Sequence, residues 1–88
     1  MKFYITANVE IRKDGEYGDE FQLYAGTDLK EAQDTKHRAE VNWSKATKRD
    51  QERSKILLMV YEIPDDTDLN DKDAVYNALC ECVGYDLI

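Results

Sequence analysis

Hydrophobic and polar residues alternate at the start of the chain. From Phe3 to Arg12, Phe, Ile, Ala and Val occupy every second position, and most residues between them are polar. Successive side chains of a β-strand point to opposite faces, so this pattern predicts a half-buried strand. The stretch 13–19 contains an Asp-Gly pair, and a second alternating stretch follows over residues 21–25. Together, these features predict an antiparallel hairpin.

A helix is expected after the hairpin. Gly26 ends the second strand, and Thr27 or Asp28 can cap a helix; with Asp28 as the cap, Glu31 occupies the third position, as in a capping box. Apolar residues then recur at helical spacing and share a narrow face, at Leu29, Ala32, Ala39, Trp43 and Ala46. No Gly or Pro interrupts residues 27–54, so we expect the helix to run to about Gln51. Trp43 is expected to anchor this helix in the core.

Two further elements complete the predicted fold. The run 55–63 is short, rich in strand-forming residues and closed by Pro64, which predicts a third strand. An acidic loop follows, and Asn70 or Asp71 can cap a second helix. The apolar residues of that helix share one face, at Val75, Ala78, Leu79 and Cys82. Gly84 is placed to end the helix.

The order of these elements predicts one α+β domain over residues 1–88. It is a three-stranded antiparallel sheet in ββαβα order, with one long helix packed on the sheet and a shorter C-terminal helix. The simplest sheet has the first strand in the middle. We expect the long helix to cover the apolar face of the hairpin, which consists of Phe3, Ile5, Val9, Ile11, Phe21 and Leu23.

The third strand carries apolar side chains on both of its faces, unlike the first strand. Its second face therefore needs a cover, because exposed apolar patches on small proteins are usually buried or functional. The second helix, a second copy of the chain and a foreign partner are the three alternatives. We take Tyr4, Tyr24 and Tyr61 as candidate partner-binding residues of the sheet.

Charge is distributed unevenly along the chain. The formal net charge is −7, but the basic segment 36–55 has a balance of +4, which leaves −11 for the remaining residues. Acidic residues gather at 10–20 and 62–73, and we take as candidate partner-binding residues Glu16, Asp19, Glu20, Asp65, Asp66 and Asp68. Such asymmetry can orient a protein on its partner. The negative net charge disfavours direct nucleic-acid binding, which uses concentrated Lys and Arg.

No sequence motif for catalysis or cofactor binding is present. The single histidine, His37, has no neighbouring Ser or Cys nucleophile in the sequence. Asp66 to Asn70 begins like a calcium loop, but the turn glycine and the bidentate glutamate of such loops are missing. Cys80 and Cys82 do not complete a zinc site and are badly spaced for a disulfide, so we expect thiols at a helix end, one facing the core. We expect no enzymatic activity, no cofactor and no metal.

These features favour a soluble, cytoplasmic binding protein. The first residues turn polar by Asn8, and the longest apolar run, 56–61, is far shorter than the roughly 20 residues of a membrane span. In size, acidity and lack of catalytic motifs, the whole chain resembles small accessory proteins of phages and mobile elements. That group includes inhibitors of CRISPR and restriction systems.

The resemblance implies a protein partner that handles nucleic acid. The acidic clusters at 10–20 and 62–73 would then occupy the groove that the partner uses for phosphates. The alternative is a homodimeric structural or regulatory module, assembled through the third strand and its sheet face.

Overall fold

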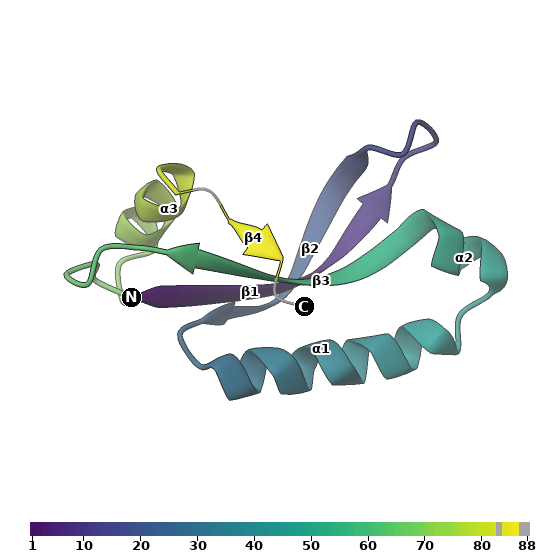
Figure 1. Cartoon of the computed structure of the whole chain (residues 1–88), viewed down its shortest axis with the longest axis horizontal. Coiled ribbons are helices and arrows are strands. Elements are labelled where there is room, and N and C mark those ends of the chain that lie inside the picture. The colour runs from purple at the N-terminus through teal and green to yellow at the C-terminus, as the bar shows by residue number, and fades with distance from the viewer. Residues whose placement is uncertain (83, 87–88) are drawn as a thin grey trace.

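The computed structural model describes residues 1–82 and 84–86 (Figure 1). Its elements are, in chain order, β1 (Lys2–Ile11), β2 (Tyr17–Gly26), α1 (Leu29–Ser44), α2 (Lys48–Arg53), β3 (Ser54–Glu62), α3 (Lys72–Cys80) and β4 (Tyr85–Asp86). The predicted α+β fold is confirmed, with a long α1 and a shorter α3 in ββαβα order. The short helix α2 and the two-residue strand β4 are additions that the sequence pattern did not predict.

Strand β1 lies between β2 and β3, as predicted. The strand order is β2-β1-β3-β4, and all neighbouring strands are antiparallel. β1 pairs with β3 without a shift, from Lys2 opposite Glu62 to Glu10 opposite Ser54. Its pairing with β2 shifts at two places, and the first shift leaves Leu23 as an extra residue in β2. Such a β-bulge locally changes which face successive side chains occupy.

The turn between β1 and β2 depends on Gly15. The Arg12 N–H donates to the Glu16 carbonyl at 2.8 Å, and the Gly15 N–H donates to the Arg12 carbonyl at 2.9 Å. Gly15 has a φ of 86°, a left-handed conformation that glycine adopts without the steric penalty of a side chain. This pattern is typical of a hairpin with a type I turn and a glycine bulge, so the Asp-Gly turn signal is confirmed.

The long helix covers the opposite sheet face from the one predicted. Ala32 of α1 packs against Tyr4, Leu58 and Val60, and the Thr6 hydroxyl donates to the Ala32 carbonyl at 2.9 Å. Judged from β1 alone, this face is polar, because Thr6, Asn8 and Glu10 lie on it. However, the apolar side chains of β3 give the face a large buried area, and the hydrogen bond satisfies the one buried hydroxyl. We call this side of the sheet the α1 face.

Helix α3 covers the other side of the sheet, which we call the α3 face. Ala78, Val75 and Leu79 pack there against a buried cluster formed by Phe3, Ile5, Ala7, Val9, Leu57 and Ile63. Both faces of β3 are therefore covered from within the chain. The second helix was one of three predicted covers for the second face, the side of Tyr4 and Tyr24, but α1 covers that side and α3 covers the side of Phe3 and Ile5 instead.

Helix α1 ends at Ser44, which is earlier than predicted. Thr47 caps the separate helix α2, and the Gln51 side-chain amide lies 3.1–3.4 Å from three carbonyl oxygens, those of Trp43, Ser44 and Ala46. The last carbonyls of a helix have no partners within the helix, and polar side chains can satisfy them. Side-chain hydrogen bonding therefore ends α1 without a Gly or Pro.

Trp43 is half-buried rather than part of the core. It lines a shallow groove of about 390 Å³ under the end of α1, together with Leu23 and Ile56. Its indole Nε1 is buried and has no hydrogen-bond partner within the described residues. Within the predicted stripe, Ala32 is buried and Ala39 and Trp43 are half-buried, whereas Leu29 is exposed and Ala46 follows the end of α1.

Both predicted helix starts are confirmed. An Asp28 carboxylate oxygen accepts a first-turn N–H of α1 at 3.1 Å, and an Asp71 carboxylate oxygen accepts two N–H groups of α3 at 3.0 and 3.3 Å. Helix α3 ends at Cys80, before Gly84. Gly84 instead lies against the Tyr61 ring, where a Cβ atom would clash. None of the helices in residues 1–82 and 84–86 is long and apolar enough to cross a membrane.

The two cysteines occupy different environments, as predicted. Cys82 packs against the cluster on the α3 face, and its thiol donates to the Glu62 carbonyl at 2.6 Å. Cys80 is exposed. The Cys80 side chain raises the pKa of the exposed Tyr76 phenol, first by hydrogen bonding and then by charge.

Candidate protein-binding surface

The two acidic clusters lie at opposite ends of the sheet. The end of β1 near Lys2 adjoins the loop that carries Asp65, Asp66 and Asp68, and the end near Ile11 adjoins the hairpin turn. Glu16, Asp19 and Glu20 follow that turn. A ten-residue strand spans about 30 Å at roughly 3.3 Å per residue, and the two ends are well separated in Figure 1. The clusters therefore do not form one continuous acidic surface.

The acidic loop after β3 has local structural roles. Asp65 forms an ion pair with the N-terminal ammonium of Met1, which lowers the pKa of the Asp65 carboxyl by hydrogen bonding first and by charge second. A carboxylate oxygen of Asp68 accepts the Asn70 N–H at 3.0 Å. Asp66 is exposed and takes no hydrogen bond or ion pair with another described residue. Two of the three candidate aspartates thus support the loop itself.

The three candidate tyrosines do not share a surface. Tyr4 is buried beneath α1, and Tyr24 packs beside it while its hydroxyl accepts the Asp28 N–H at 3.1 Å. Tyr61 lies on the α3 face, half-buried, with its hydroxyl 3.7 Å from the Met59 sulfur. The structure therefore does not bring them together as one partner-binding patch.

Strand β2 carries three exposed apolar side chains, and the sequence pattern placed two of them, Phe21 and Leu23, on the apolar face of the hairpin. Tyr17, Phe21 and Leu23 expose 52%, 70% and 39% of their surface. Phe21 lies opposite Asn8, on the α1 face, yet α1 leaves its ring uncovered. The bulge at Leu23 is responsible for part of this difference, because a strict alternation from Phe21 to Ala25 would have kept these residues in one apolar row. No sequence signal marks the bulge.

The acidic residues Asp19 and Glu20 directly precede Phe21 in the same exposed strand. Glu20 lies opposite Val9, so it belongs to the α3 face, whereas Phe21 belongs to the α1 face. β2 is also an edge of the sheet, because no other strand of the described chain pairs with its outer side. Carboxylates, an aromatic ring and open backbone groups therefore occur together on the β2 edge, which we define as Tyr17–Gly26.

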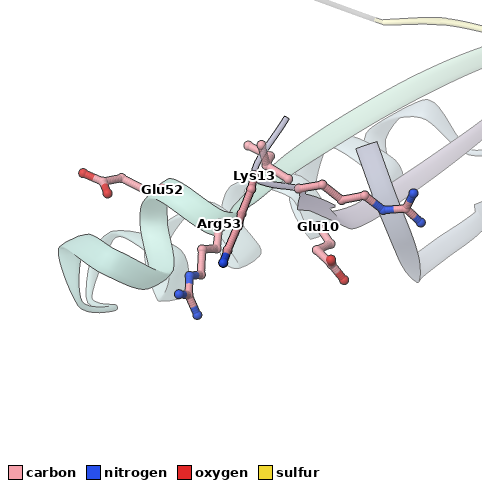
Figure 2. Close-up of a pocket in the computed structure, with 6 residues that line it drawn as sticks. Glu10, Lys13, Glu52 and Arg53 are labelled. Carbon is pink, nitrogen blue, oxygen red and sulfur yellow. The ribbon is translucent and has the colours of Figure 1, made fainter. Parts of the chain in front are cut away.

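A cleft of about 710 Å³ separates the hairpin from α2 (Figure 2). It is lined by both positive and negative side chains, those of Glu10, Arg12, Lys13, Glu52 and Arg53, together with Ile11. Figure 2 shows Glu52 pointing away from the other labelled side chains. No ion pair joins these residues in the described part of the chain. The mixed charges do not select either an anionic or a cationic ligand.

A second groove, of about 630 Å³, lies between the sheet and α3. Exposed Leu69 and Tyr76 line it together with Gln22 and Ala25 of β2, so it adjoins the β2 edge on the α3 face. The described residues contain no group of three His, Cys, Asp or Glu side chains that could hold a metal ion. His37 is exposed on α1.

Comparisons of the chain with family models, curated proteins and solved structures find no match. What the molecule can bind is therefore inferred from its own surface. On that surface, the β2 edge combines Phe21, which has the highest exposed fraction among the large apolar side chains of the described residues, with adjacent carboxylates and unpaired strand backbone.

Proposed function

We propose that this chain is a non-enzymatic binding protein that docks its acidic β2 edge and hairpin turn on a basic protein. The observation that carries the proposal is the exposed Phe21 beside Asp19 and Glu20 on an open edge strand. Opposite charge orients and accelerates the encounter with a basic partner. An aromatic side chain that becomes buried on contact contributes to affinity. The hairpin turn stands clear of both α1 and α2 in Figure 1.

The most concrete form of this function is inhibition of a nucleic-acid-handling protein, of the anti-CRISPR or antirestriction type. Such partners bind phosphates through clustered Lys and Arg. Glu16, Asp19 and Glu20 offer carboxylates to the same cations, and occupancy by the hairpin would exclude nucleic acid from the groove. The acidic loop at the other end of the sheet is too distant to contribute to the same contact unless the partner surface extends about 30 Å.

The test compares two variants with equal loss of negative charge. One replaces Glu16, Asp19 and Glu20 with the corresponding amides, and the other replaces Asp65, Asp66 and Asp68 with Asn. Each variant and the parent chain are used for affinity capture from the native host. We expect the parent and the loop variant to capture a nucleic-acid-binding protein that the hairpin variant loses.

Two further measurements establish whether the contact is electrostatic and competitive. Binding to the captured partner should weaken as salt rises from about 50 to 200 mM, because exposed charges are screened over a Debye length near 10 Å. Double-stranded DNA should compete with the chain for the partner. Capture that survives in the hairpin variant, or that DNA does not affect, would contradict the proposal.

A homodimeric module is the alternative function. None of the apolar side chains of β3 is exposed, and β4 pairs with its edge at Met59 and Val60. A dimer built on a sheet face of the third strand would therefore have to displace α1 or α3, whereas the β2 edge is accessible. Sedimentation at low micromolar concentration separates the alternatives, because a stable dimer without a captured partner would favour the module.

A further inference from the structure

We propose that the β2 edge binds an extended, basic segment of a partner protein as an additional β-strand. This inference rests on the binding function proposed above and specifies its chemistry. Strand addition uses the outward N–H and C=O groups of an edge strand for affinity and alternate side chains for specificity. β2 is ten residues long and terminates the sheet, so its outer side offers these groups between and beyond its two bulges.

The side chains of β2 specify an alternating segment. Phe21 and Leu23 lie toward the α1 face, where apolar side chains of an added strand would cover them. Glu20 and Gln22 lie on the α3 face, opposite Val9 and Ala7. Directly opposed side chains on one face contact each other, so Lys or Arg in the added strand would lie beside Glu20. The complementary segment therefore alternates apolar and basic residues.

The charge of β2 argues against a second copy of the chain as the occupant. Asp19 and Glu20 are the ionisable acids of this strand, and the sequence from 17 to 26 contains no Lys, Arg or His. Pairing of two β2 strands would bring together two acidic edges of molecules that each carry a net charge of −7. Like charges on paired strands are destabilising, whereas a basic segment gains from the same carboxylates.

The probe is an eight-residue peptide that alternates Val and Lys, and its control is the same peptide with N-methylated backbone amides at alternate residues. Methylation keeps the charge and removes the hydrogen-bond donors that face β2. We expect the parent peptide to bind and to slow hydrogen exchange of β2 amides. Alternate methylation removes four donors, and loss of even two of their hydrogen bonds should weaken the binding of the peptide by about tenfold or more.

Matched variants of the chain test the side-chain part of the proposal. Glu20→Lys and Asp66→Lys change the net charge equally, but only the first lies on the β2 edge. We expect Glu20→Lys to weaken peptide binding several-fold and Asp66→Lys to change it by less than about twofold. Phe21→Ser, at a side chain that is already 70% exposed, should also weaken binding while the fold persists. Circular dichroism of each variant checks the fold.

Equal affinity for the two peptides would overturn the inference, because it would show attraction by charge without strand pairing. A stable homodimer that Phe21→Ser dissociates would also overturn it and would assign the edge to a second copy. Capture of a partner through the hairpin without protection of β2 amides would contradict strand addition alone. Strand addition of the peptide without any nucleic-acid-handling partner would contradict the proposed function alone.

Discussion

At residue 6, a polar side chain is completely buried between the sheet and a helix. Thr6 has no exposed surface, and its hydroxyl donates to the Ala32 carbonyl, which joins β1 to α1 across 26 residues of sequence. Ala32 is also fully buried, so the helix approaches the strand closely at this point. A buried hydroxyl without a partner would cost free energy, and this hydrogen bond therefore helps to fix where α1 lies on the sheet.

Thr6→Val removes this hydrogen bond and keeps the side-chain volume nearly unchanged. We expect a loss of about 1 kcal/mol in the free energy of unfolding, which is typical of a single hydrogen bond. Urea unfolding followed by circular dichroism measures the loss. Thr27→Val, at an exposed threonine in the loop before α1, is the matched control and should have a much smaller effect. Equal stability of the Thr6 variant and the parent would show that the hydrogen bond is not stabilising.

Among the elements, the end of α1 shows how a helix can stop without a helix-breaking residue. Gln51 lies in α2, and its side-chain amide is within hydrogen-bond distance of the carbonyl oxygens at the end of α1. Near this helix end, Trp43 lies over the α1 face in a groove that it shares with Leu23 of β2 and Ile56 of β3. A continuous helix would have carried α2 away from the start of β3.

Gln51→Met tests this account, because methionine has a similar length but cannot donate to the carbonyls. We expect the variant to lose about 1 kcal/mol of stability and its tryptophan emission to shift toward that of an exposed indole. Gln33→Met, on the exposed side of α1, provides the control. An unchanged emission spectrum and melting temperature would mean that Thr47 and the surrounding packing are sufficient to end α1.

On the scale of the whole molecule, contacts between residues far apart in the sequence hold the N-terminus in place. The N-terminal ammonium donates to the Ile63 carbonyl and pairs with the Asp65 carboxylate, so the first residue is held by the loop after β3. The Asp65 carboxylate thus supports the fold, whereas no ion pair engages Asp19 or Glu20 in the described part of the chain.

The Met1–Asp65 pair makes stability depend on pH in the acidic range. The pKa of Asp65 is lower in the folded state, so the folded state favours the charged carboxylate. This contribution is fully present above the unfolded pKa of an aspartate, about 3.9, and is lost as pH falls through the lowered folded value. We expect Asp65→Asn to melt at a lower temperature than the parent at neutral pH, and the difference to vanish in strong acid. Asp66→Asn should show no such convergence.

Local patterns in the sequence determined the three longer strands and the starts of α1 and α3, but not α2, β4 or the end of α1. Strand alternation, the Asp14–Gly15 turn and the caps Asp28 and Asp71 all depend on residues close together in the chain, so the sequence alone predicted them. The same holds for the central position of β1, since one hairpin and one helical crossover leave few simple topologies. The sequence also identified the acidic residues of the candidate surface, but it did not predict that they lie at opposite ends of the sheet.

Only the tertiary structure decided which helix covers which face and which side chains remain exposed. The face of Tyr4 and Thr6 looks polar in β1, and becomes buried because β3 contributes Leu58 and Val60 beside them. The sequence pattern places Phe21 in an apolar row, yet its side chain remains exposed. A bulge interrupts the alternation of β2, and α1 does not cover the Phe21 ring. Both outcomes depend on how several strands and α1 pack together, which no single stretch of sequence contains.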